Sequence, residues 1–214
     1  MSNFEYIVAS LPVLLPDYKY GSGEAFNTLV QEIRDNLSEK DNALVDFLLS
    51  GFESENLNQD FYAKALHHSN RFIREYFRFD LNKRNAIVRR LNEELGREEG
   101  TDIMTGEGSD DDSSLDIDGF RFRGGEFEEE RTLGEVLSQK DLLTRERGID
   151  DLTWNKVNAL TVFNYFDVNA ILGFIAKLHI ADRWLSLDED EGRERFRTLV
   201  KEVKGTFKGI NYEN

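Results

Sequence analysis

Apolar residues recur at helical spacing along most of this chain, and this periodicity constrains the fold more than any other feature. In the first clear example, Phe26, Leu29, Val30, Ile33 and Leu37 recur among charged and polar residues, as on one face of an amphipathic helix. The chain contains only 2 prolines, both near the N-terminus, so proline does not interrupt the later stripes. The pattern therefore predicts long helices and argues against a loop-rich β-sandwich.

Residues that commonly start or end helices divide the first half of the chain into segments. Ser, Asn and Asp cap helix N-termini, and Gly commonly follows the last turn. The starting signals are Ser38 with Asp41, and Asn58 or Asp60, and the ending signals are Gly51 and Gly96. One long helix is expected to start at Asn58 or Asp60, and Asp80 is expected to break it or to cap the next helix, whose apolar stripe ends at Gly96. The opening segment, Phe4 to Leu15, fits either a strand or a short buried helix.

The second half of the chain shows the same kind of pattern. Helix restarts at Thr132, and we expect Asp150 or Thr153 to cap a following helix. Asp167 precedes the most apolar helix, whose apolar residues cover most of its circumference, so this helix is expected inside the bundle. A final amphipathic helix is expected from about Asp188 to Gly205. Its apolar stripe consists of Phe196, Leu199, Val200 and Val203.

A strongly acidic segment separates the two halves. Residues 97–131 hold 13 acidic and 4 basic residues, which is −9 of the total charge of −15. Such a segment cannot bury enough apolar surface to offset the entropy of ordering, so we expect an acidic loop or a disordered insert. The predicted architecture is an all-α, two-lobed helical bundle with lobes at 1–96 and 132–214. A loose similarity between 71–82 and 180–188 suggests that the lobes are repeated helical units.

Composition excludes several classes of function. With no cysteine, the chain has no disulfide, no thiolate nucleophile and no Cys-ligated zinc or iron–sulfur site. A net charge of −15 argues against sequence-independent binding to nucleic acid, which requires a cationic surface. No stretch approaches the roughly 18–20 apolar residues of a membrane helix. We therefore expect a cytoplasmic protein without a membrane span.

Basic residues are concentrated in one part of this acidic chain. Arg71, Arg74 and Arg78 follow helical spacing among aromatic residues, and Arg84 comes soon after them. Arginine and aromatic side chains are enriched at protein interfaces, so one interpretation is a contact surface for an acidic partner. The other interpretation is pairing within the chain, with its many acidic residues. Both stay open at the level of sequence.

Motifs for metal or cofactor chemistry are incomplete. Asp116 and Asp118, followed by a glycine, match part of a calcium-binding loop, but the acidic ligands expected on both sides are missing. His67 and His68 are adjacent, whereas two ligands on one helix face need a spacing of three or four residues. We therefore predict no catalytic, cofactor-binding or metal-binding residues. A metal-dependent enzyme that uses the two histidines with nearby carboxylates is the alternative.

Three stretches resemble known families. Asp167–Leu185, an apolar helix with an internal glycine that leads into an acidic residue and a basic turn, resembles a helix of a V/A-type ATPase subunit. This is the central-stalk socket subunit, called C or d. Phe79–Arg90 resembles another element of the same subunit. The opening Phe4–Pro12 resembles a bacterial family of unknown function that is encoded beside V-type ATPase subunits.

The resemblance implies a role in a complex and no reaction. The socket subunit is an all-α funnel of repeated helical units, without catalytic residues or bound nucleotide, that sits on the membrane rotor ring and grips the rotating shaft. The resemblance thus implies a peripheral subunit or accessory factor that links shaft and ring at the inner face of the cell membrane. Phe174 and Trp184 then join the four arginines as candidate partner-contact residues.

This chain departs from the socket subunit in two respects. It has about two helical units where that family usually has three, and its acidic insert has no counterpart there. The alternative to the ATPase role is an acidic helical adaptor protein that is unrelated to ATPases.

Overall fold

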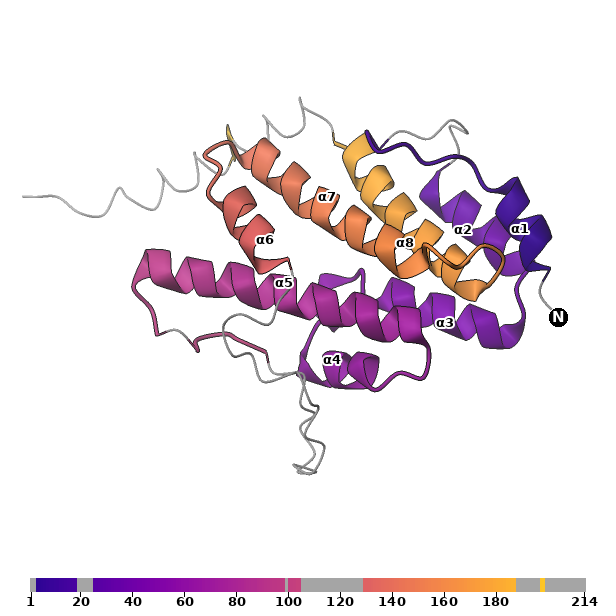
Figure 1. The fold of residues 1–214 in the computed structure, drawn as a ribbon, viewed down its shortest axis with the longest axis horizontal. Helices are drawn as coiled ribbons and strands as arrows, with labels where there is room; N and C mark the ends of the chain where they lie inside the picture. Colours follow the sequence, from indigo (N-terminus) through magenta and orange to yellow (C-terminus); the bar gives the residue numbers. More distant parts are fainter. Residues whose placement is uncertain (1–2, 19–24, 99, 105–128, 188–196, 199–214) are drawn as a thin grey trace, which may run out of the picture.

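A computed structural model describes residues 3–18, 25–98, 100–104, 129–187 and 197–198. The fold is all-α, as predicted (Figure 1). In chain order, the helices are α1 (Phe4–Ser10), α2 (Phe26–Asp35), α3 (Glu39–Ser50), the short 3-10 helix η1 (Ser54–Asn56), α4 (Gln59–Leu66), α5 (Arg71–Leu95), α6 (Glu130–Leu137), α7 (Leu142–Thr161) and α8 (Val168–Leu185). Most of the predicted acidic insert and most of the predicted final helix lie outside the described residues.

Most of the predicted helix ends are confirmed. The Ser38 side chain caps α3 by accepting a hydrogen bond from the backbone N–H of Asp41 at 3.3 Å. Asn58 caps α4 and Asp167 caps α8 through the same type of contact. Gly96 ends α5 with a φ of 64°, in the left-handed region that glycine adopts at little cost. The first part of the opening segment, Phe4–Ser10, is the helix α1.

The predicted break at Asp80 is wrong. Helix α5 runs without interruption from Arg71 to Leu95, and Asp80 lies in its interior. The helix tolerates this residue because the carboxylate is paired with cations three and four positions further along. A break occurs instead at 67–70, inside the segment that the periodicity predicted as one helix, and the Asn70 side chain caps α5 there.

The predicted start of α7 is also wrong. Asp150 and Thr153 lie inside α7, and the helix is capped by Asp141, whose carboxylate accepts from the backbone N–H of Thr144 at 2.7 Å. Asp150 is bound by side chains of α8, so its role is in tertiary packing and not in starting a helix. Helix α6 begins at Glu130, within the span that was predicted as insert.

The main hydrophobic core surrounds α8. This helix contacts α1, α2, α3, α5 and α7, and 9 of its 18 residues are buried, as expected for a helix inside the bundle. Figure 1 shows α7 and α8 side by side, with α5 running below them and α4 below α5 in that view. The largest buried cluster includes Val45 and Ile73 from before the insert and Val157 and Ile175 from after it. Helices of both predicted lobes therefore share one core, and the lobe boundaries themselves stay a prediction.

Two buried asparagines hold the chain that leaves α5 against that helix. Asn85 donates from Nδ2 to the carbonyl of Met104 at 2.7 Å, and its Oδ1 accepts from the Met104 N–H at 3.1 Å. Asn92 donates to the carbonyl of Thr101 at 2.8 Å. The first residues of the predicted insert, up to Met104, are therefore fixed along α5 by side-chain contacts that satisfy backbone groups.

Candidate functional site

The predicted basic surface on α5 is largely paired with the acidic side chain of one residue. Arg78 donates to both carboxylate oxygens of Glu75, at 2.9 and 2.8 Å, and the Arg74 guanidinium lies 3.6 Å from the same carboxylate. Arg74 also donates to the carbonyl of His68 at 2.8 Å. Arg71, at the first position of α5, is exposed. All three arginines keep part of their surface in water, so a partner can reach them. Their contact with a partner stays a prediction.

Arg84, the fourth predicted contact residue, belongs to a buried cluster around Asp80. The Asp80 carboxylate accepts hydrogen bonds from the Tyr62 hydroxyl and from Arg84 Nε, each at 2.7 Å, and the Lys83 ammonium lies 2.9 Å away. Burial would raise the pKa of Asp80, but Lys83 and Arg84 outweigh it and hold that pKa well below its usual range. Burial and the nearby Asp80 charge raise the pKa of Tyr62. A charged carboxylate is thus fixed between α4 and α5.

A second buried carboxylate, Asp150, joins α7 to the end of α8. Its Oδ2 atom accepts hydrogen bonds from the Arg183 guanidinium and from the indole N–H of Trp184, the latter at 2.6 Å. Trp184, a predicted partner-contact residue, is half-buried. Its polar edge is therefore used inside the protein, while its ring lines a hollow at the surface.

The adjacent residue, Asp151, anchors the N-terminal segment to the same place. The Tyr18 hydroxyl donates to Asp151 Oδ1 at 2.6 Å, and Tyr18 is only 1% exposed. The Tyr18 ring packs against Trp154 and Trp184, with centroid distances of 5.3 and 5.8 Å. The Arg147 guanidinium lies 3.5 Å from the centroid of the Tyr18 ring, a cation–π contact. Three distant segments of the chain meet in this cluster.

Tyr18 adopts an unusual backbone conformation at this contact. Its φ is 66°, a left-handed value that few residues other than glycine adopt. Arg147 supports this turn from α7 by donating to the carbonyl of Pro16 at 2.7 Å. Burial and the hydrogen bond to Asp151 both raise the pKa of Tyr18, so the phenol stays neutral. Packing and hydrogen bonds of the whole cluster therefore offset the local strain.

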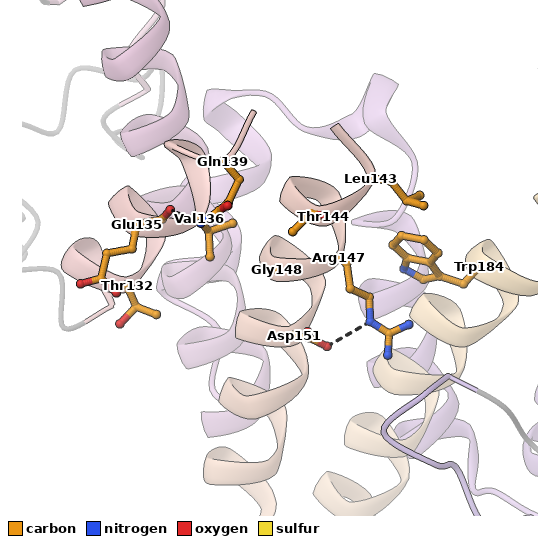
Figure 2. A pocket seen from close by; sticks show the side chains of 10 residues that line it. All are labelled: Thr132, Glu135, Val136, Gln139, Leu143, Thr144, Arg147, Gly148, Asp151 and Trp184. Atoms are coloured by element: carbon orange, nitrogen blue, oxygen red, sulfur yellow. Dashed lines mark hydrogen bonds and ion pairs between the residues drawn. The ribbon is translucent and has the colours of Figure 1, made fainter. Parts of the chain in front are cut away.

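The face of α7 that carries Arg147 and Asp151 borders a cleft of about 730 Å³ between α6 and α7 (Figure 2). The cleft is lined by Thr132, Glu135, Val136, Gln139, Leu143, Thr144, Arg147, Gly148, Asp151 and Trp184. Gly148 allows the close approach of the two helices, because a Cβ at that position would lie 2.7 Å from Val136. Figure 2 shows the ion pair from Arg147 to Asp151 along one side of the cleft, with 3.4 Å between Nε and Oδ1.

An apolar hollow of about 430 Å³ adjoins this cleft at the start of α7 and the end of α8. Leu142, Leu143, Trp184 and Leu187 line it, with Asp141, Glu146 and Arg183 at its edge. The hollow and the cleft share Leu143 and Trp184, so they are adjacent, and we call them together the α7 groove. Leu142, Leu143 and Leu187 are 61, 60 and 62% exposed. The groove therefore offers apolar contact surface with acidic residues beside it.

The opposite end of the α7–α8 pair carries a second exposed apolar surface. Val162, Phe163, Tyr165 and Phe166, in the loop between the two helices, are 54, 85, 68 and 57% exposed. We call these four residues the apolar turn. The Asn164 amide donates to the carboxylate of the α8 cap residue, which fixes the conformation of the loop. Contiguous exposed apolar side chains of this size mark interaction sites in soluble proteins.

A protein-family model covers most of the elements described above. The model described as "Protein of unknown function (DUF2764)" matches residues 54–206 of the chain. This chain belongs to the DUF2764 family. The matched region extends from η1 through α8, so it includes both buried carboxylates, the cleft and the apolar turn, but not Tyr18. Searches of curated proteins and of solved structures found no match.

The remaining predicted contact residue of this DUF2764 protein, Phe174, lies in the interior. Phe174 belongs to the main core cluster and is 9% exposed. Because α8 is apolar almost all round, its periodicity does not tell which of its aromatic side chains face water. The apolar turn, which sequence analysis did not single out as a contact surface, exposes far more aromatic area.

The two adjacent histidines of the DUF2764 chain contact nearby backbone groups. The His68 ring accepts a hydrogen bond from the backbone N–H of Asn70 at 3.0 Å, and burial lowers the His68 pKa. His67 Nδ1 lies 2.8 Å from the carbonyl of Ala63. Across the described residues, no group of three or more His, Asp or Glu side chains is placed to hold a metal ion. Asp116 and Asp118 lie outside those residues.

Proposed function

We propose that this protein is a non-catalytic, peripheral subunit or accessory factor of a V/A-type rotary ATPase, and that it links the central shaft to the membrane rotor ring. The observation that carries the proposal is the apolar turn, where three aromatic side chains and a valine face water together. A protein that acts alone in solution rarely exposes such a patch, and a subunit covers it with a partner. The cytoplasmic face of the membrane is the corresponding location.

The resemblance to the socket subunit supplies the identity of the proposed partners. The two stretches of this chain that resemble it, Asp167–Leu185 and Phe79–Arg90, correspond to α8 with its cap residue and to the middle of α5. In this structure α8 is the central helix of the core and α5 contacts it, so the resemblance concerns the framework of the bundle. The apolar turn immediately precedes that framework helix, which places the proposed contact surface at its N-terminal end. No helix in the described parts of the chain is long and apolar enough to cross a membrane.

A co-purification experiment with matched variants tests the proposal. Tagged protein is recovered from gently solubilised membranes, and bound proteins are identified by mass spectrometry. The double variant Phe163→Ser/Phe166→Ser removes most of the exposed aromatic surface, and we expect it to lose at least about tenfold of the bound shaft and ring subunits. The control is Leu95→Ser, which changes an exposed apolar residue, 55% accessible, at the end of α5.

Three results distinguish the possible outcomes. Recovery of ATPase subunits with wild type and Leu95→Ser, but not with the turn variant, supports both the function and its contact surface. Recovery with all three proteins overturns the role of the apolar turn. If wild type recovers other proteins and no ATPase subunit, the acidic helical adaptor is the better description. Charge reversal of Arg71, Arg74 and Arg78 tests the earlier prediction for α5 in the same assay.

A further inference from the structure

The α7 groove is exposed beside the point where the described part of α8 ends. Leu187, the last described residue before the C-terminal segment, itself lines the groove. Leu142 and Leu143 form its apolar floor and are each about three-fifths exposed. Because exposed apolar area costs roughly 25 cal/mol per Å², covering this floor would stabilise the fold. The C-terminal segment is therefore attached to the chain at a residue that lines the groove.

The C-terminal sequence has the features that such a groove requires. Phe196, Leu199, Val200 and Val203 follow the spacing i, i+3, i+4 and i+7, which places all four on one face of a helix. Residues 197–198 are helical and exposed, and their positions lie off this stripe. The two described residues therefore fit a helix that turns its polar face outward and its apolar stripe toward the protein.

Charge also favours this pairing. Residues 193–208 contain 6 basic and 2 acidic residues, in a chain whose net charge is −15. Asp141 and Glu146 lie at the edge of the hollow, and Glu135 lines the adjoining cleft. The one arginine at the edge of the hollow, Arg183, is already paired with Asp150. The groove thus combines an apolar floor with acidic residues, and the segment combines an apolar stripe with basic residues.

We propose that residues 193–204 bind the α7 groove of the same chain as an amphipathic helix, with the apolar stripe on Leu142 and Leu143 and the basic residues toward Asp141 and Glu146. Only residues 188–192 separate this segment from Leu187, and five residues span at most roughly 17 Å. So short a connection gives an effective concentration on the order of millimolar, which favours the same chain over a second copy. The groove would then be closed to other partners, and the apolar turn would remain open.

Disulfide trapping in the full-length protein tests this placement directly. The chain has no cysteine, so the introduced thiols are the only ones present. Leu143→Cys is combined in turn with Phe196→Cys, Leu199→Cys, Val200→Cys and Val203→Cys, because a disulfide forms only when two Cα atoms come within about 7 Å. The control places the partner cysteine in the apolar turn, as Val162→Cys, with the same four positions. Mild oxidation and non-reducing electrophoresis report the products.

We expect a cross-linked monomer for at least one pair in the groove and none for the Val162→Cys pairs. If all four groove pairs fail to form a cross-linked monomer, the proposal is wrong. Cross-linked dimers without monomers would also overturn it, because they assign the groove to a second copy. These outcomes are independent of whether the protein binds an ATPase.

Limited proteolysis supplies a second readout that needs no cysteine. Trypsin cleaves after the arginines and lysines of residues 193–204, and docking of this segment slows that cleavage. The variant Leu142→Ser/Leu143→Ser should increase the cleavage rate at least about tenfold, because proteolysis follows the population of the undocked form. Leu95→Ser, which alters an exposed leucine outside the groove, should leave the rate unchanged. Equal rates in all three proteins would contradict docking.

Discussion

The two buried carboxylates of this fold differ in how far along the chain their partners lie. Asp80 is paired with Lys83 and Arg84, which follow within one turn of the same helix. Asp150 is bound by an arginine and a tryptophan of α8, 33 and 34 positions later. Both carboxylates are almost fully buried, at 6 and 8% exposure. Asp80 therefore stabilises α5 and its contact with the preceding helix α4, whereas Asp150 holds α7 and α8 together.

The surroundings of the two carboxylates also differ. The Lys83 and Arg84 side chains beside Asp80 are 12 and 41% exposed, whereas the Arg183 side chain, the one cation paired with Asp150, is 49% exposed. Water screens the second pair more strongly, so it should contribute less to stability. Its position matters in another way, because Asp150 orients Trp184, which lines both parts of the α7 groove. Asp80 therefore supports the bundle, whereas Asp150 shapes its surface.

Removing the Asp80 charge should have the largest effect. In Asp80→Asn, two cations and a tyrosine keep their positions without a charged partner, and breaking a buried pair in this way costs about 3 kcal/mol of unfolding free energy. Urea denaturation measures the loss. The control is Glu94→Gln, which removes the exposed pair with Arg90 and should cost less than about 0.5 kcal/mol. Equal losses for the two variants would refute the role assigned to Asp80.

The pH dependence of this loss sharpens the assignment. The folded protein holds the pKa of Asp80 below its ordinary value, so the unfolded chain takes up this proton first as the pH falls. The stabilisation is complete above the unfolded pKa of about 4 and is lost at lower pH. The difference in unfolding free energy between wild type and Asp80→Asn should therefore be constant from pH 8 to 5 and should shrink below pH 4. If this difference in unfolding free energy grows as the pH falls, Asp80 is not the stabilising carboxylate described here.

Asp150→Asn should have an intermediate effect. The asparagine still offers an oxygen to the Trp184 indole, but it no longer neutralises Arg183. We expect a loss of about 1.5 kcal/mol, typical of a hydrogen bond to a charged group. Denaturation followed by tryptophan fluorescence measures both the loss and the altered surroundings of Trp184. A loss as large as that of Asp80→Asn would contradict the difference drawn between the two sites.

Tyr18→Phe tests the link between α7 and the N-terminal segment. The substitution keeps the stacked ring and removes only the hydrogen bond to Asp151, so it should cost about 1 kcal/mol. Because the pKa of Tyr18 is raised by folding, its stabilisation is present below pH 10 and is lost as the pH rises further. The variant should therefore lose less stability than wild type in alkaline solution. A steeper alkaline loss in the variant would argue against the buried phenol.

His179 should show the smallest effect, confined to mildly acidic pH. Its ring stacks on Phe52 with 4.1 Å between centroids, and burial lowers its pKa. The unfolded chain therefore binds the proton first, so stability is present above the unfolded pKa of about 6.5 and falls as the pH decreases. His179→Phe keeps the stack, and between pH 7 and 5 it should lose less unfolding free energy than wild type, by under about 1 kcal/mol. Identical pH profiles would show that His179 does not titrate with folding.

Helix ends could be predicted from sequence where their cause is local. The Ser38, Asn58 and Asp167 caps each act on a backbone N–H three residues away, and Gly96 supplies a left-handed residue. Asp80 was misassigned because aspartate alone disfavours a helix interior, while its two nearby cations offset that preference. The same pairing could have been recognised from the i, i+3 and i, i+4 spacing.

The candidate site could not be predicted in the same way. The contact of Tyr18 with Asp151 joins residues 133 positions apart, and no local pattern reports such a pair. The sequence predicts a helix cap at Asp150, because the partners that bind this carboxylate lie on another helix and no local pattern reports them. The apolar turn could not be predicted either. The sequence shows that Phe163 and Phe166 are apolar, but it does not show that the loop turns their side chains toward water.

The most direct test of the proposed function is the composition of what binds the wild-type protein. Tagged protein would be recovered from gently solubilised membranes under native conditions, and the bound subunits would be quantified by mass spectrometry. We expect shaft and ring subunits of a V/A-type ATPase in a fixed ratio to the tagged chain. Recovery of the tagged chain with no ATPase subunit would contradict it and would leave the acidic adaptor as the function to pursue.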